Sequence, residues 1–242
     1  MYSRGTVISE KKNKANVSPC LTIDVLTLFP GMFKGPLRES MLKIAQTKGL
    51  VRIKVHNLRT YTQDRHKKAD DKPFGGGPGM VMKPEPIFRA VEDICDEDHH
   101  KIYLTPEGKP FTQVIAKRLA GMKKVLLLCG HYEGVDERVR EHAIDEEISV
   151  GDFVTTGGEI PALCLIEAMA RLVPGVLGNE DSLEHESFNN GLLDHPHYTR
   201  PRLYKGYAVP EVLVSGDHGE VERWRKDQAL HRTKERRPDL LS

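Results

Sequence analysis

Three glycine-rich loops in the middle of the chain carry the residue types that could hold a small cofactor. They cover residues 104–108, 129–134 and 150–159. Glycine lets a backbone approach a ligand closely, and ligands of open α/β sheets bind where the chain leaves the strands. None of the loops matches a GxGxxG or GxxxxGK[ST] phosphate motif. Together they predict a cofactor with an adenine-like ring and no phosphates, although each loop taken singly could be only a tight turn.

A fourth glycine-rich segment, residues 74–80, has four glycines within five positions. Such a loop is almost without side chains and could lie flat against a planar base or a backbone. The prolines at 73 and 78 stiffen its ends, whereas a plain flexible linker is usually richer in serine. Contact with a flat ligand is therefore predicted, and a linker is the alternative. The basic cluster at 65–68 is explained as well by ordinary solvated surface.

The last third of the chain concentrates basic and aromatic side chains. Residues 195–202 combine histidines, arginines and a tyrosine on a proline-bounded segment, and residues 223–237 form a basic run around Trp224, the only tryptophan. Basic groups neutralise phosphates, and an aromatic ring can stack on a base. The pattern favours RNA binding. A charged helix face with internally paired acidic residues explains the second run equally well.

Strands and helices alternate through the part of the chain that must position these loops. Apolar runs predict strands at 21–28, 51–55, 102–104 and 125–129, and one or two short strands within 148–155. Helical spacing predicts helices at 36–48, 86–94, 111–122, 136–143 and 159–172, with a long loop at 61–84. The strand at 125–128 is apolar on both faces, which is typical of a parallel sheet covered by helices. The predicted fold class is α/β.

Composition limits the classes of protein to which the chain can belong. With 36 basic and 35 acidic residues among 242, the net charge of +1 neither demands nor excludes nucleic acid. No apolar run approaches the roughly 18–20 residues that cross a bilayer, so no membrane partner is expected. The four cysteines form no CxxC pair, which argues against zinc. Those at 95, 129 and 164 lie in apolar contexts and predict reduced core residues of a cytoplasmic protein.

Shifts in composition predict four parts along the chain. Residues 1–20 are polar, lack the apolar core of a signal peptide and predict a flexible N-terminal extension. Residues 21–178 form the α/β domain, and the acidic segment 179–187 is predicted as an interdomain linker. Residues 188–242 are predicted as a small helical domain, with helices at 211–214, 220–230 and from 232 onward.

Five motifs occur in one order, at 74–80, 130–138, 151–159, 174–178 and 193–201. On these residues the chain closely resembles the bacterial tRNA (guanine-N1)-methyltransferase family, of TrmD type, in the SPOUT superfamily. The resemblance runs from about Leu21 to Leu241. It implies a methyltransferase domain tied in a deep trefoil knot, and a C-terminal domain that binds tRNA. It also implies an obligate homodimer whose active site lies between the subunits.

The resemblance further implies the reaction. The methyl group of S-adenosylmethionine passes to N1 of guanosine 37, just 3′ of the anticodon, when another guanosine precedes it. The cofactor sits bent in the knot, on positions that match the family's cofactor residues: Tyr103, Leu104, Thr105, Pro106, Gly108, Gly130, Tyr132, Glu133, Val150, Gly151, Asp152, Phe153, Val154, Thr155, Gly157, Gly158 and Pro161. These positions fall in the three loops singled out above.

Neutral guanine N1 carries a proton, so a general base must remove it as the methyl bond forms. The resemblance places that carboxylate at Glu186, from the partner subunit, where the family usually has Asp. Arg171 matches an arginine near guanine O6, where a cation would stabilise developing negative charge. The expected contacts to the RNA substrate, with Asp194 also the second candidate for the base, are Gly76, Gly77, Asp194, His197 and Arg200.

Two other functions were weighed against this one. A non-catalytic RNA-binding protein would have no use for three glycine-rich loops at one sheet edge. The other alternative is a methyltransferase of related knotted fold that acts on rRNA or on a ribose 2′-hydroxyl. The presence of both Glu186 and Arg171 favours base methylation over ribose methylation. Family members need Mg²⁺ for full activity, but no ligand cluster in the sequence identifies a metal site.

Overall fold

The computed structural model describes residues 20–178 and 186–241. The chain divides into two compact units, one of residues 1–111 with 116–176 and one of residues 112–115 with 177–242. The predicted N-terminal extension, except Cys20, and the predicted linker, except Glu186 and Ser187, lie outside the described residues. The predicted domain boundary and linker therefore stay predictions. Within the described residues, no helix is both long and apolar enough to span a membrane.

The first unit is built on a five-stranded sheet in the order β2-β1-β6-β5-β7, and every pairing is parallel. The strands are β1 (Leu21–Thr27), β2 (Val51–Asn57), β5 (His99–Pro110), β6 (Lys124–Cys129) and β7 (Glu146–Ser149). The register is fixed by pairs such as Ile23 with Val125 and Ile102 with Leu127. The predicted α/β class with a parallel sheet is confirmed.

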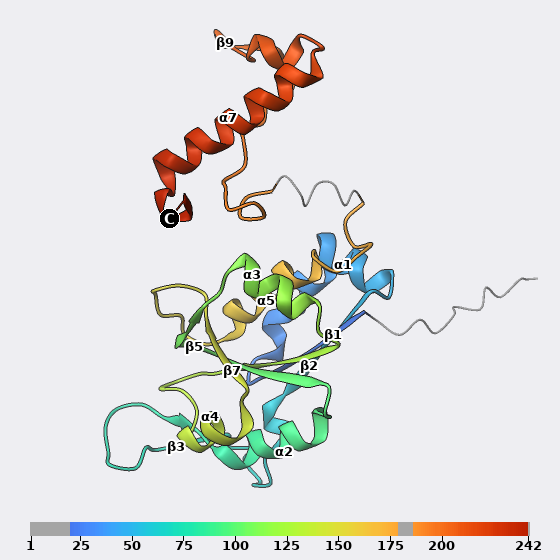
Figure 1. Cartoon of the computed structure of the whole chain (residues 1–242). Coiled ribbons are helices and arrows are strands. Elements are labelled where there is room, and N and C mark those ends of the chain that lie inside the picture. Colours follow the sequence, from blue (N-terminus) through green and yellow to red (C-terminus); the bar gives the residue numbers. More distant parts are fainter. Residues whose placement is uncertain (1–19, 179–185, 242) are drawn as a thin grey trace, which may run out of the picture. The chain divides into compact units, whose positions relative to one another are not determined.

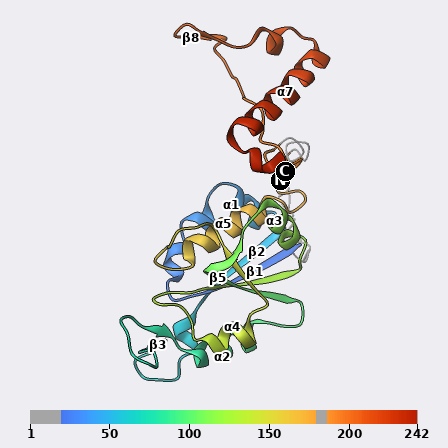
Figure 2. The same ribbon diagram turned by 60° about the vertical axis from the view of Figure 1, so that its left-hand side comes forward.

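Helices cover both faces of this sheet. Figure 1 and Figure 2 both show α1 (Ser40–Thr47) and α5 (Glu159–Ala170) on one face, and α2 (Pro84–Ile94) and α4 (Glu137–Ala143) on the other. Helix α3 (Gln113–Ala120) connects β5 to β6. Three short 3₁₀ helices complete the unit: η1 (Pro30–Phe33), η2 (Pro36–Arg38) and η3 (Leu58–Tyr61).

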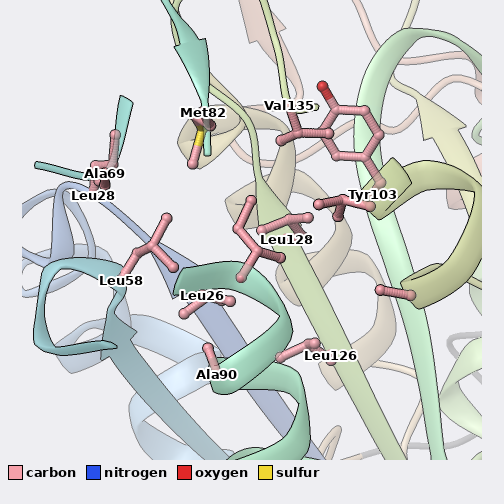
Figure 3. Close-up of a cluster of buried hydrophobic side chains, with 13 residues drawn as sticks. Leu26, Leu28, Leu58, Ala69, Met82, Ala90, Tyr103, Leu126, Leu128 and Val135 are labelled. Carbon is pink, nitrogen blue, oxygen red and sulfur yellow. The ribbon is translucent and has the colours of Figure 1, made fainter. Parts of the chain in front are cut away.

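The core explains why the central strand is apolar along its whole length. All residues of β6 from Val125 to Cys129 are buried. Leu126 and Leu128 join the cluster under α2 and α4, which also holds Tyr103 and Val135 (Figure 3). Because side chains alternate along a strand, Val125 and Leu127 face the opposite layer. Burial on both faces is what the continuous aliphatic run predicts.

The structure corrects several predicted elements. Strand β5 runs to Pro110, because Lys109 and Pro110 pair with β7 again after a register shift that follows Leu104. The segment 150–155 holds no strand. The predicted loop at 61–84 contains β3 (Asp70–Asp71) and β4 (Val81–Met82), a two-residue antiparallel pair too short to show a periodicity.

The cysteines are less buried than predicted. Cys129 is buried, Cys95 is half-buried and Cys164 is exposed on α5. The apolar context of Cys164 misled the prediction because most of α5 is apolar, yet the face that carries Ile160, Cys164 and Glu167 is exposed.

The second unit contains a hairpin that was not predicted. Strands β8 (Leu203–Tyr204) and β9 (Tyr207–Ala208) pair antiparallel, and Lys205 and Gly206 between them both have positive φ, as in a tight hairpin turn. A 3₁₀ helix follows, η4 (Glu211–Val214). One helix, α7 (His218–Arg236), replaces the two predicted helices, and η5 (Pro238–Leu241) ends the described chain.

Candidate cofactor and catalytic site

The three predicted cofactor segments meet around one cavity of about 280 Å³ in the first unit, although the first, 104–108, is not a free loop and lies inside β5 at its register shift. Predicted cofactor residues line it, except Gly108, Gly151 and Asp152, and their role in binding stays a prediction. The predicted residues on the cavity wall are Tyr103, Leu104, Thr105, Pro106, Gly130, Tyr132, Glu133, Val150, Phe153, Val154, Thr155, Gly157, Gly158 and Pro161. Those that the sequence analysis missed are Glu107, His131, Gly134, Val135, Arg140, Ile148, Ser149 and Thr156.

Glycines are needed at these loops because backbone and side chains approach too closely for any Cβ. A Cβ at Gly158 would lie 2.7 Å from Cα of Cys129, and one at Gly130 would lie 2.9 Å from the Tyr103 ring. A Cβ at Gly108 would lie 2.4 Å from the backbone nitrogen of Ile148, so this glycine serves the packing of β5 on β7. Gly108 therefore does not line the cavity, but it allows β5 to pack closely on β7 behind the cavity wall.

Backbone contacts tie the second loop to the third. The N–H of Gly158 donates to the carbonyl of Gly130 at 2.8 Å, and His131 and Gly157 form an isolated antiparallel bridge. Tyr132, beside His131, has a positive φ of 61°, which is unusual for a residue with a bulky side chain. Positive φ in a non-glycine residue is often found at functional sites, where the surroundings hold the strained conformation.

Charged residues form one side of the cavity. The Arg140 guanidinium contacts both Glu147 oxygens at 2.8 Å and Glu107 at 2.7 Å. The hydrogen bonds to Glu147 come first among the causes that raise the pKa of Arg140. Burial raises the pKa of Tyr103, which is only 5% exposed. The wall therefore carries the Glu107 carboxylate, held by Arg140, and the Glu133 carboxylate beside apolar residues such as Leu104 and Ile148.

The 74–80 loop is anchored to the second cofactor loop. The N–H of Glu133 donates to the carbonyl of Met80 at 3.0 Å, and a Cβ at Gly79 would overlap the Glu133 side chain. Gly76 and Gly77 both have positive φ and open space around them, and they do not line the cavity. The plain-linker alternative therefore fits poorly, because one end of the segment is fixed beside the cavity.

The two predicted catalytic residues do not line the cavity wall of their own chain. Arg171 is the C-cap of α5, whereas the third loop precedes the first residue of this helix. Its 12 residues rise about 18 Å, so the arginine and the loop lie at opposite ends. Glu186 belongs to the second unit, where its carbonyl accepts the N–H of Asn189 at 3.3 Å.

In the second unit, Asp194 bridges two histidines. Its carboxylate lies 2.7 Å from Nδ1 of His195 and 2.8 Å from Nε2 of His197. Burial raises the pKa of Asp194, but bonds to His197 and to the N–H of His195 outweigh it, so the pKa lies below its usual value. Burial lowers the pKa of His195, although Asp194 opposes the shift. Arg200 is exposed nearby in the sequence.

These three side chains are also the one group in the described residues whose ligand atoms could hold a metal, lying within 4.8 Å of one another. This cluster was not predicted, because its three residues lie within four positions and lack the spacing of a known metal motif. Two imidazoles and one carboxylate suit a transition metal better than Mg²⁺, which prefers oxygen ligands.

Sequence signals for the missed wall residues were weak. His131 lies inside the second loop, and only its neighbours drew attention. Arg140 lies on α4, where its charge resembles an ordinary solvated helix face. Its partners Glu107 and Glu147 come from β5 and β7, and only the fold brings them together.

Comparison with known proteins gives a consistent result. A family model described as tRNA (Guanine-1)-methyltransferase TrmD matches residues 21–242. A tRNA (guanine-N(1)-)-methyltransferase of Dehalococcoides mccartyi is 53% identical, covering 91% of this chain and 90% of its own. Relatives with the same name from Staphylococcus epidermidis and Carboxydothermus hydrogenoformans are 54% and 56% identical, each over 91% of this chain and over 91% and 87% of their own.

Proposed function

The chain belongs to the tRNA (guanine-1)-methyltransferase family, and we propose that it transfers a methyl group from S-adenosylmethionine to N1 of guanosine 37 in tRNAs with a preceding guanosine. The observation that carries the proposal is the meeting of three glycine-rich loops around one cavity. The cytoplasm, where tRNA is modified, is the proposed location.

The cavity suits S-adenosylmethionine chemically. Gly130 and Gly158 have no room for a Cβ, and their bare backbone lets a flat ring lie against the main chain. Apolar side chains, among them Leu104 and Ile148, line the wall together with the carboxylates of Glu107 and Glu133. Arg140 pairs with Glu107, so the Glu133 carboxylate is the one that favours a ligand with a positive sulfonium and an amino group. When bound, S-adenosylmethionine supplies the methyl group as an electrophile.

Glu186 and Arg171 perform the acid–base part of the reaction in this proposal. The Glu186 carboxylate accepts the proton of guanine N1, which makes the nitrogen nucleophilic. The guanidinium of Arg171 stabilises the negative charge that develops on O6. The charge at Arg171 is also favoured by its place at the C-terminus of α5, where the helix dipole is negative.

The places of these residues support a proposed homodimer with a shared site. Arg171 and the third loop are at opposite ends of α5, so one chain does not place them together through this helix. Helix α5 is mostly apolar, and it exposes Ile160 and Cys164, one turn apart on one face, with the exposed Glu167 at the next turn. An uncovered apolar stripe of this kind is typical of an interaction surface, and a second copy of the chain is the proposed partner.

The trefoil knot is proposed on family grounds. Support comes from the crossing of the second and third loops, where Gly158 lies against the backbone of Cys129. The second unit is proposed to bind the anticodon stem-loop through His197, Arg200 and the basic residues of α7. Mg²⁺ does not fit the Asp194 group, and no step is assigned to it.

Methyl-labelled S-adenosylmethionine and two tRNA transcripts test the function. The transcript with guanosine at 36 and 37 should be methylated at N1, as read by nucleoside mass spectrometry. The transcript with adenosine at 37 should remain unlabelled. Equal labelling of both, or methyl groups on ribose, would exclude the proposed reaction.

A further inference from the structure

We propose that Glu159 is a positioning residue that accepts the Nδ1–H of His131 and so holds the second cofactor loop against the third. This inference rests on the proposed function of the cavity, which His131 lines. Neither residue is among those that the sequence analysis assigned to the site.

The Glu159 carboxylate is buried and already anchored on one side. The residue is 2% exposed, and its Oε1 accepts the hydroxyl of Thr27 at 2.7 Å. Thr27 ends β1, and its Oγ1 also accepts the N–H of Phe29 at 2.8 Å. Glu159 is the first residue of α5, where the helix dipole favours a negative charge. The carboxylate therefore has one fixed oxygen and one still available for a second donor.

His131 offers the matching group. Within the described part of the chain, its Nδ1 is one of two buried side-chain atoms without a hydrogen-bond partner. Buried polar groups are almost always paired, so this nitrogen needs a partner. Nδ1 of His131 and Oε2 of Glu159 each lie 2.4 Å from the point where a Cβ of Gly157 would be. The two atoms are thus at most twice that distance apart, on opposite sides of the point that a Gly157 Cβ would fill, and the proposed bond requires a side-chain rotation that brings them closer.

The absence of a side chain at Gly157 makes this approach possible, because any Cβ there would separate the two groups. The His131 ring is otherwise held by aromatic neighbours, with centroids 4.7 Å from Phe29 and 4.8 Å from Tyr132. With Nδ1 protonated, the tautomer is fixed and Nε2 is left as an acceptor. Glu159 thereby couples the end of β1, the start of α5 and the loop after β6.

Long-range ¹H–¹⁵N correlation spectra of the full chain, with ¹⁵N-labelled histidine, test the pair without any cofactor. At pH 8, where an ordinary histidine is neutral, His131 should carry its proton on Nδ1. In Glu159→Gln, Oε1 keeps the Thr27 hydroxyl and the amide nitrogen takes the place of Oε2. That nitrogen is a donor, so the His131 proton should move to Nε2. Glu167→Gln, an exposed position on the same helix, should leave the tautomer unchanged.

Cofactor affinity supplies the second readout. The Kd for S-adenosylmethionine should rise roughly tenfold in His131→Gln, which leaves Oε2 of Glu159 unpaired, and stay within about threefold in Glu159→Gln, whose amide pairs with the other tautomer. His131→Asn keeps a donor at the position of Nδ1 and should stay within about threefold. The proposal is overturned if wild-type His131 carries its proton on Nε2. It is also overturned if the His131 tautomer is the same in wild type and in Glu159→Gln. If the tautomer responds but S-adenosylmethionine does not bind, the pair stands and the proposed function fails.

Discussion

The cavity loops of the first unit and the Asp194 segment of the second unit are fixed by different means. At the cavity, backbone lies on backbone, as where Gly158 contacts Cys129 and Gly130. In the second unit, polar side chains hold the backbone. The N–H of Leu193 donates to Oγ1 of Thr233 at 2.9 Å, and that of Asp194 donates to Oγ of Ser187 at 3.0 Å.

The two units also differ in how many of their described side chains are buried. The first unit buries aliphatic side chains on both faces of its sheet, whereas Thr233 is the one residue of the second unit that is buried among those described. A site made by backbone contact should tolerate no added atom, because its neighbours are close-packed. A segment pinned by side chains should tolerate any substitution that preserves the donor or acceptor. The predictions below test this difference.

Among the substitutions that test this difference, Gly158→Ala should have the largest effect on cofactor affinity. Its φ of −77° suits alanine, so only the 2.7 Å approach to Cys129 opposes the new Cβ. Overpacking of this kind costs about 1–3 kcal/mol, and the loops must shift. We expect the Kd for S-adenosylmethionine, measured by calorimetry, to rise by more than roughly tenfold. Gly35→Ala is the matched control, since its φ is −73° and its Cβ would meet nothing within 4 Å. Equal affinities in the two variants would contradict the close-packed description.

Asp24→Asn tests a segment of the first unit that side chains hold in place, so it separates the type of contact from the unit in which the contact lies. Asp24 is buried in β1 and contacts His56 at 2.6 Å and His99 at 3.5 Å. Loss of the charge should lower the free energy of unfolding by about 1–3 kcal/mol, with cofactor affinity unchanged. Urea unfolding gives the first quantity and calorimetry the second. A large change in cofactor affinity would show that this cluster also shapes the cavity.

The same carboxylate predicts a pH dependence. Burial raises the pKa of Asp24, but the hydrogen bond and charge of His56, with Lys54 and His99, outweigh it, so the pKa lies below 3.8. A lowered pKa means that the stabilisation is complete above the unfolded value of 3.8 and is lost as pH falls through the folded value. The stability difference between wild type and Asp24→Asn should therefore be constant from pH 6 to about 5 and shrink below about 4.

Thr233→Val should act on the second unit alone. It removes the hydroxyl that accepts Leu193 N–H and donates to the carbonyl of Ala229 at 2.7 Å. We expect a loss of about 1 kcal/mol and faster amide exchange at Leu193, with unchanged cofactor affinity. Thr233→Ser keeps the hydroxyl and should recover most of the protection. If serine performs no better than valine, packing and not the hydrogen bond holds this segment.

Arg200→Gln should have the smallest effect. The side chain is exposed, so the fold should not change. Loss of one phosphate contact should weaken tRNA binding severalfold and reduce the slope of log K against log salt by about 1. Filter binding over a salt series measures both. Arg38→Gln, exposed in the first unit, is the matched control, and an equal loss there would argue against a specific role of the second unit.

Sequence patterns predicted what depends on local signals. The apolar run of β6 and the glycines at 130, 157 and 158 were sufficient to predict the parallel sheet and the loops that line the cavity. Long-range pairing was not predictable in the same way. Strand β5 extends to Pro110 only because β7 accepts it again after a register shift. Arg140 is placed at the cavity by contacts with the distant residues Glu107 and Glu147.

The β8–β9 hairpin was missed for another reason. Its two strands have only two residues each, on either side of a turn at Lys205 and Gly206, and strands this short show no periodicity. The exposed face of α5 was missed because an apolar helix gives no indication of which side is left uncovered.

Glu186→Gln tests the central claim most directly, namely that the first unit binds the cofactor and the second supplies the base. Calorimetry and single-turnover methyl transfer to the guanosine 36–guanosine 37 transcript should be measured on the same preparation. We predict a Kd for S-adenosylmethionine within about twofold of wild type and a methyl-transfer rate that falls by roughly 10²–10⁴. A rate close to that of the wild type would contradict the account.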